Sequence, residues 1–273
     1  MDILYVTDLD GTLLNNKGEL SKYTIYTINE LTNKGMCFSY ATARSLISAS
    51  NVTNGLIIDI PIITKNGIFI ENAYTKEKIY SLKFSVEDKA FLMDTMEKYS
   101  IYPLVYSYIN EMERKSWIKD KENEAIKSEI NAWKEDTRLR PVNNITDLFY
   151  GDIFHINCMG KKEELIEIFN FLQKTEKFSC LLQKEYYSEH YWCEILPKNA
   201  TKGNAILFLK DKLRCNKIIT FGDGLNDIPM FKISDECYAV ENAEEELKKI
   251  ATGIIMSNEN DGVAHWLSEN YKK

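Results

Sequence analysis

Two acidic residues, Asp8 and Asp10, stand two positions apart directly after a short apolar segment, Ile3 to Thr7. In open α/β sheets the ligand crevice lies outside the carboxyl ends of the strands, so this loop is where a site is expected. One carboxylate of such a pair can attack phosphorus while the other donates and accepts a proton. Two close carboxylates repel each other unless a cation lies between them, which favours a hard divalent ion such as Mg²⁺.

A second acidic loop follows another short apolar segment, Ile218 to Phe221, and reads Gly222-Asp223-Gly224-Leu225-Asn226-Asp227. Its glycines let the backbone turn sharply, and Asp223 and Asp227 could complete an oxygen-ligand shell. Each loop alone also fits a solvated turn or a helix cap. The first loop begins like a calcium loop, but the later ligands of that pattern are missing. Two acidic loops at one sheet edge favour a shared metal site.

A phosphate bound near these acids would need hydroxyl and cationic partners. Thr42 follows the apolar segment Met36 to Ala41 and precedes a helix start, where hydroxyl and amide groups suit an anion. Lys202 can supply a point charge from a loop that opens a helix. Alone, Thr42 would be interpreted as a helix cap and Lys202 as a solvated lysine. The two acidic loops are what favours a phosphate-binding role for both.

The elements that must position these residues alternate between strand and helix signals over the first 80 residues. The spacing of apolar residues predicts a helix from Ser21 to Lys34, with Ser21 as its N-cap, and another helix beginning near Arg44. Asn66-Gly67 predicts a tight turn into a hairpin. The same alternation returns after about Lys198. This order predicts an α/β fold with a doubly wound, Rossmann-like, mostly parallel core sheet.

The middle of the chain has a different character. Charged helical stretches alternate there with β-rich pieces such as Tyr102 to Tyr108 and Ile153 to Cys158, which predicts a separate α+β lobe. Both flanks carry the core pattern, so the lobe is an insertion. We therefore predict a core domain of residues 1–82 and 188–273 and an inserted cap domain of residues 83–187.

Composition excludes several classes of protein. The 273 residues carry 34 Lys and Arg against 41 Asp and Glu, a formal net charge of −7, which argues against binding to nucleic acid or to an anionic membrane. We find no apolar run long enough to span a membrane and no secretory signal, so we expect a cytoplasmic protein. The six cysteines are scattered and are expected to be reduced. A monomer is the default expectation.

Taken in order, these residues resemble the haloacid dehalogenase superfamily of phosphohydrolases, and within it the Cof-type sugar-phosphatase-like group. The shared pattern is a D-x-D-G-T loop at Asp8 to Thr12, a Thr after the second strand at Thr42, a Lys before a late helix at Lys202, and a G-D-G-x-N-D loop at Gly222 to Asp227. The group's large inserted cap matches residues 83–187. One departure is Ala43, where the family usually has glycine, and its methyl group is tolerated if φ is negative.

The resemblance implies that Asp8 is a nucleophile that forms an aspartyl-phosphate and that Asp10 is the general acid and base. It implies a Mg²⁺ cofactor held by Asp8, the main-chain carbonyl of Asp10 and Asp223, with Asp227 in support. The residues that it places around the phosphate or substrate are Leu9, Thr42, Ala43, Lys202 and Asn226. The implied activity is Mg²⁺-dependent hydrolysis of a small phosphorylated metabolite, such as a sugar phosphate.

Three alternatives stay open from the sequence. A phosphomutase would use the same aspartyl-phosphate but return the phosphoryl group to a sugar hydroxyl. A receiver-like signalling module also has an acidic pocket, Mg²⁺, Thr and Lys on a doubly wound sheet, although the acid two residues after Asp8 and the long insertion do not fit it. A non-catalytic sensor of a phosphorylated ligand could keep the same residues.

Overall fold

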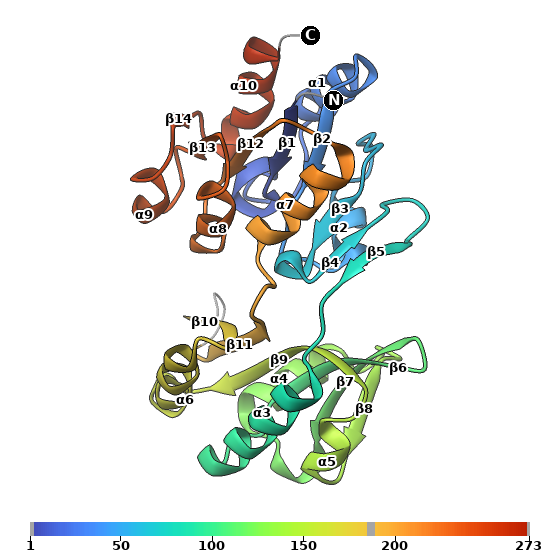
Figure 1. Cartoon of the computed structure of the whole chain (residues 1–273), viewed down its shortest axis with the longest axis vertical. Helices are drawn as coiled ribbons and strands as arrows, with labels where there is room; N and C mark the ends of the chain where they lie inside the picture. The colour runs from blue at the N-terminus through green and yellow to red at the C-terminus, as the bar shows by residue number, and fades with distance from the viewer. Residues whose placement is uncertain (1–2, 185–188, 272–273) are drawn as a thin grey trace. The chain divides into compact units, whose positions relative to one another are not determined.

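The computed structural model describes residues 3–184 and 189–271 (Figure 1). Its internal contacts divide the chain into two compact units, one built from the chain up to Ser81 and from Ala200 onward, the other from Leu82–Asn199. Each unit has its own sheets and its own hydrophobic core. Among the described residues, no helix is both long and apolar enough to cross a membrane.

The first unit is built on a five-stranded sheet in the order β14-β13-β12-β1-β2, in which every pair is parallel. Strand β1 lies between β12 and β2 and is buried on both faces, which explains its nearly continuous apolar run. The strands of this sheet are β1 (Ile3–Thr7), β2 (Cys37–Tyr40), β12 (Lys217–Gly222), β13 (Glu236–Val240) and β14 (Gly253–Ile255).

Helices connect these strands and supply the rest of the core. In α1 the predicted N-cap is present, because the Ser21 hydroxyl accepts a hydrogen bond from the Thr24 N–H at 2.9 Å. Helices α1 and α10 pack against each other, and so do α7 and α8. The helices of this unit are α1 (Lys22–Asn33), α2 (Leu46–Val52), α7 (Lys202–Leu213), α8 (Ile228–Phe231), α9 (Glu245–Lys248) and α10 (Gly262–Asn270).

A small antiparallel sheet contains the predicted hairpin and extends it by a third strand. The apolar run from Leu56 onward forms a strand only at its end, β3 (Ile62–Thr64), which pairs with β4 (Phe69–Glu71) and, through it, with β5 (Lys78–Ser81). A single parallel bridge between Ala41 and Ile63 joins β3 to the end of β2. The turn at Lys65–Gly67 links β3 to β4, as the Asn-Gly pair predicts.

The second unit is a six-stranded sheet in the order β10-β11-β9-β6-β7-β8, antiparallel except for the pair β7 and β8. Its strands are β6 (Leu104–Ile109), β7 (Met112–Ile118), β8 (Leu139–Val142), β9 (Asp152–Gly160), β10 (Phe178–Lys184) and β11 (Tyr191–Pro197), and its helices are α3 (Val86–Tyr99), α4 (Glu124–Ala132), α5 (Ile145–Leu148) and α6 (Lys162–Thr175). Helices α3 and α6 bury Leu92, Met96 and Leu165 in a core shared with Ile156. The parallel core sheet with a separate inserted mixed sheet confirms the predicted fold class.

The end of the insertion differs from the boundary at 187/188 that the sequence suggests. Strand β11 pairs with β10 from Lys184↔Tyr191 to Phe178↔Pro197 and with β9 on its other edge. The chain therefore stays in the second unit until Asn199. Residues 185–188, on which the predicted boundary falls, lie outside the described residues.

This placement of β11 predicts a large effect of truncating its buried face. Ile195 is fully buried opposite Ile156, so Ile195→Ala should lower the free energy of unfolding by about 2–5 kcal/mol. Val86→Ala, at a side chain of the same unit that is 73% exposed, should change it by less than about 0.5 kcal/mol. Urea denaturation followed by circular dichroism measures both. Equal midpoints for the two variants would contradict the assignment of β11 to this core.

Candidate active site

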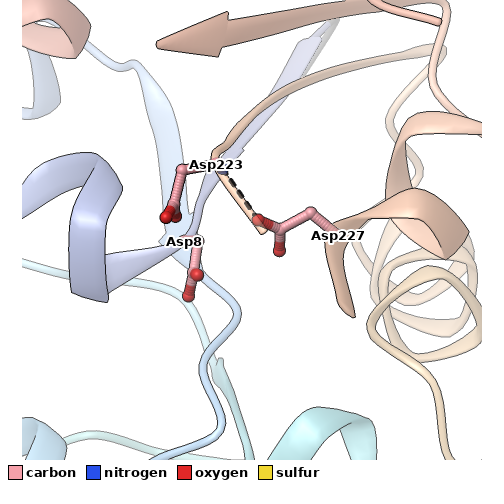
Figure 2. Close-up of side chains that lie close together, drawn as sticks. All are labelled: Asp8, Asp223 and Asp227. Atoms are coloured by element: carbon pink, nitrogen blue, oxygen red, sulfur yellow. Dashed lines mark hydrogen bonds between the residues drawn. The ribbon is translucent and has the colours of Figure 1, made fainter. Parts of the chain in front are cut away.

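Two neighbouring parallel strands bring the acidic loops together at their carboxyl ends. In the pairing of β1 with β12, Thr7 lies opposite Phe221, and the Asp8 N–H donates to the Phe221 carbonyl at 2.9 Å. Asp8 and Asp223 therefore leave the sheet at the same edge. Carboxylate oxygens of Asp8, Asp223 and Asp227 all lie within 4.8 Å of one another, and Figure 2 shows the three side chains in one group.

The loop after β1 is shaped around Asp223. Gly11 has φ +75°, and a Cβ atom at this position would lie 2.3 Å from Asp223 Oδ2, so no side chain fits there. The next residue, Thr12, donates its hydroxyl hydrogen to Asp223 Oδ1 at 2.6 Å. The Gly-Thr pair of the D-x-D-G-T pattern thus gives the Asp223 carboxylate both its space and a hydrogen-bond donor.

Asp227 is fully buried and is held by main-chain groups of its own loop. Its Oδ2 accepts hydrogen bonds from the N–H groups of Asp223 at 2.9 Å and Gly224 at 3.0 Å, the first of which is the dashed line in Figure 2. A Cβ atom at Gly222 would lie 2.6 Å from the same oxygen. Asp227 therefore fixes the turn that carries Asp223.

Lys202 is the cation of the site. Its side chain is fully buried at the start of α7, and its Nζ lies 2.8 Å from Asp8 Oδ1 and 2.7 Å from Asp227 Oδ1. The Thr201 hydroxyl caps the same helix by accepting from the Asn204 N–H at 3.1 Å. A buried ammonium is tolerated only with close anionic partners, and here two carboxylates provide them.

The electrostatics of the cluster follow from burial. Burial raises the pKa of Asp8 above its ordinary range, against the attraction of Lys202, and the neighbouring carboxylates raise it further. Burial also raises the pKa of Asp223 to about 6, although the hydrogen bond from Thr12 opposes this. For Lys202 burial alone lowers the pKa, but the charges of Asp227 and Asp8 outweigh it and raise the pKa overall.

The donor set fits a divalent cation. Three carboxylates share a single ammonium in a buried site, where burial first and the neighbouring carboxylates second raise the pKa of Asp8 and Asp223, so a bound cation would favour their ionised form. The ligand atoms available are hard carboxylate oxygens, which suit Mg²⁺ or Ca²⁺ rather than a soft metal. Asp227 already accepts three hydrogen bonds, so Asp8 and Asp223 have more of their oxygen surface left for a metal.

The other residues singled out from the sequence lie on the loops around this cluster. Thr42 is fully buried after β2, and its Oγ1 accepts from the Arg44 N–H at 3.1 Å. Ala43 is exposed and is not in the left-handed region, so its methyl group fits where the family usually has glycine. Leu9 follows Asp8 directly, and its side chain is fully buried in the core. Asn226 is half-buried between Asp223 and Asp227.

Two further residues brace these loops and escaped the sequence analysis. The Asn66 N–H donates to the Thr42 carbonyl at 2.9 Å, and its Oδ1 accepts from Asn226 Nδ2 at 3.3 Å. Asn66 has φ +54°, a left-handed conformation that asparagine tolerates better than most residues. In the sequence, Lys65-Asn66-Gly67 indicated a turn and a stretch similar to the family, but no role in the site. Arg44 forms an ion pair with Asp10, and its position just after Thr42 was the signal available.

Asp10 itself lies apart from the other three acids. Its side chain is 51% exposed and faces Arg44, and it is not part of the group of carboxylates around Asp8. The metal contact that the resemblance implies for Asp10 concerns its main-chain carbonyl. The Asp10 side chain is not needed as a metal ligand in that arrangement and can take part in proton transfer.

Two phosphatases and one solved structure are similar to this chain along nearly their whole length. The chain is 24% identical over 271 residues to one 5-amino-6-(5-phospho-D-ribitylamino)uracil phosphatase of Bacillus subtilis, covering 98% of this chain and 97% of the relative. It is 26% identical over 284 residues to a second one from the same organism, covering 96% of each. A crystal structure of a Thermotoga maritima protein matches with a TM-score of 0.78 and 28% identity, over 100% of this chain and 99% of that one.

The family pattern of the haloacid dehalogenase-like hydrolases matches residues 5–267, which includes both acidic loops, Thr42 and Lys202. The match runs through both compact units and confirms the resemblance that the motifs indicated. The chain belongs to the haloacid dehalogenase-like hydrolases.

Proposed function

We propose that this protein is a Mg²⁺-dependent phosphatase that hydrolyses a small phosphorylated metabolite through an aspartyl-phosphate on Asp8. The observation that carries the proposal is the buried contact of Asp8 with Lys202, beside Asp223 at the ends of two adjacent parallel strands. Phosphoryl transfer depends on positioning and on neutralising the charge of the phosphoryl oxygens, and this arrangement serves both.

The first step forms a bond between an Asp8 carboxylate oxygen and phosphorus while the bond from phosphorus to the leaving oxygen breaks. Asp10 gives its proton to that leaving oxygen, so the product departs as an alcohol. In the second step Asp10 takes a proton from water, the water oxygen bonds to phosphorus, and the bond to Asp8 breaks. Inorganic phosphate leaves, and Asp8 is again a carboxylate.

The remaining residues bind and orient the phosphoryl group. Lys202 presents its ammonium beside Asp8 and supplies a positive charge to the oxygens of the incoming phosphate. Thr42 and Asn226 offer a hydroxyl and an amide from the neighbouring loops, and the resemblance adds Leu9, which follows Asp8 in the chain, and Ala43, which follows Thr42. Asn66 keeps the Asn226 amide in place through its hydrogen bond.

Asp8, Asp223 and the main-chain carbonyl of Asp10 would hold Mg²⁺, with Asp227 supporting through the loop that it braces. When bound, Mg²⁺ supplies two positive charges that offset the buried carboxylates and the phosphate oxygens. Burial of Asp8 disfavours its charged form, and the Lys202 ammonium at 2.8 Å opposes that effect, so that Asp8 can attack as a carboxylate.

For the substrate, the two Bacillus subtilis relatives named above support a sugar or sugar-alcohol phosphate, because their names specify a phosphorylated ribityl chain. A panel of hexose phosphates, ribitol 5-phosphate, nucleotides and 5-amino-6-(5-phospho-D-ribitylamino)uracil, assayed for phosphate release, should give the highest kcat/KM in the sugar and sugar-alcohol members. Preference for nucleotides would overturn this substrate class without affecting the proposed chemistry.

Replacement of the nucleophile tests the mechanism. Asp8→Asn should lower Mg²⁺-dependent hydrolysis of p-nitrophenyl phosphate by at least about 10³-fold, because an amide cannot form the acyl phosphate. The matched control is Asp59→Asn, an exposed acid outside the site, which should keep full activity. If Asp8→Asn hydrolysed p-nitrophenyl phosphate as fast as the unaltered enzyme, the proposed aspartyl-phosphate intermediate would be refuted.

Metal binding should depend on pH in a definite direction. The pKa of Asp223 is raised to about 6 in the metal-free protein, so below that pH Mg²⁺ must displace a proton. The same raised pKa means that the metal-free fold loses stability as pH rises from about 4 through 6, since the ordinary carboxyl pKa in the unfolded chain is about 3.9. Adding Mg²⁺ should therefore raise Tm more at pH 7.5 than at pH 5.5.

Thermal unfolding with 10 mM MgCl₂ or with EDTA, at both pH values, measures this difference. Asp223→Asn should abolish most of the Mg²⁺-dependent rise in Tm at pH 7.5, whereas Asp59→Asn should retain it. An equal rise at the two pH values would contradict the coupling between metal binding and the protonation of the site.

A further inference from the structure

The guanidinium of Arg44 forms two parallel hydrogen bonds with the carboxylate of Asp10. Arg44 Nε donates to Asp10 Oδ2 at 2.7 Å, and Nη2 donates to Asp10 Oδ1 at 2.5 Å. This paired geometry is specific to arginine, because lysine offers a point charge and no planar fork. Within residues 3–184 and 189–271, these are the hydrogen bonds that the Asp10 carboxylate accepts.

Arg44 is itself held from several directions. Its Nη1 donates to the Ser48 hydroxyl on α2 at 3.1 Å, its backbone N–H donates to Thr42 Oγ1 at 3.1 Å, and its carbonyl accepts from the Lys65 N–H at 3.0 Å. The main chain of Arg44 is therefore tied to the turn before β4, and its side chain is tied to α2. A group restrained in this way can set the direction of a partner side chain.

Stability alone does not account for this ion pair. The Asp10 side chain is 51% exposed and that of Arg44 is 26% exposed, so the pair is open to water. Exposed ion pairs contribute only about 0–1 kcal/mol to folding. The placement of a proton-transfer group weighs far more, since an error of about 1 Å in a reacting group can cost about 10²-fold in rate.

We propose that Arg44 is the positioning residue of Asp10, holding its carboxyl group where it exchanges protons with the leaving oxygen and with water. The inference rests on the proposed function, in which Asp10 is the general acid and base. Arg44 acts through Asp10, and its own side chain need not touch the substrate.

A different role for Arg44 makes a different kinetic prediction. An arginine that bound the substrate phosphate directly would raise kcat/KM by the same factor for every leaving group, because every phosphomonoester carries the same phosphoryl oxygens. An arginine that positions the general acid matters most when the leaving oxygen is basic and needs a proton. The dependence of rate on the leaving group therefore separates the two roles.

The test compares phenyl phosphate, which has a poor leaving group, with p-nitrophenyl phosphate, which has a good one, by kcat/KM in saturating Mg²⁺. For each substrate, kcat/KM covers only the steps up to the transfer of the phosphoryl group to Asp8. It therefore does not depend on the later hydrolysis of the aspartyl-phosphate. Arg44→Met should lower kcat/KM by about tenfold or more for phenyl phosphate, and by less than about threefold for p-nitrophenyl phosphate, as expected for partial loss of general-acid catalysis worth about 10²–10⁴-fold.

Two further variants complete the design. Arg44→Lys keeps the charge without the fork and should recover part of the loss for phenyl phosphate. Asp59→Asn, at an exposed acid outside the site, is the control and should change kcat/KM for neither substrate by more than about twofold. If Arg44→Met fails to fold by circular dichroism, Arg44→Lys carries the comparison.

A double-mutant cycle gives the decisive measurement. If Arg44 acts through Asp10, then Arg44→Met should have little further effect on kcat/KM for phenyl phosphate in the Asp10→Asn background. Equal losses on both substrates, or additive losses in the cycle, would overturn the positioning role. Failure of the proposed function is distinguishable, because it would appear as an absence of Asp8-dependent hydrolysis in the unaltered enzyme.

Discussion

The buried ammonium of Lys202 is the interaction on which the rest of the site depends. An unpaired charge at this depth would cost several kcal/mol, and the carboxylates of Asp8 and Asp227, at 2.8 and 2.7 Å, offset that cost. These three residues come from opposite ends of the chain, on either side of the inserted second unit. Both ion pairs form only where β1, α7 and the loop after β12 meet, so the packing of the core sheet and the geometry of the site depend on each other.

The carboxylates of Asp223 and Asp227 exclude side chains from two positions in the acidic loops. A Cβ atom at Gly11 or Gly222 would collide with an oxygen of Asp223 or Asp227. The glycines of the two acidic loops therefore provide more than conformational freedom, because they are the surfaces against which carboxylates pack. Such close packing also leaves the acids poorly solvated, which is why the pKa of Asp223 is raised to about 6 in the metal-free protein.

The sequence predicted best where one physical pattern dominates. Buried parallel strands are continuous apolar runs, and acids at their ends marked both loops of the site. Strand β7, Met112–Ile118, was missed because its Glu-Arg-Lys run shows no apolar alternation. Lys115 is buried there beside Asp136, with which it forms an ion pair, and over the ring of Trp133. Contacts such as those of Asn66 with Thr42 and Asn226 are set by tertiary structure, which no local pattern reports.

Asp8 and Asp10 are two residues apart, yet their environments are opposite. Asp8 is buried against Lys202, whereas half of the Asp10 side chain is exposed and its charge is met by Arg44 at the surface. A nucleophile gains from losing water, because a weakly solvated carboxylate beside a cation attacks without first shedding a hydration shell. A general acid and base must regain or release a proton in every turnover, which requires access to solvent. The φ of +75° at Gly11 lets the chain turn away directly after Asp10, which keeps these two environments separate over so short a distance.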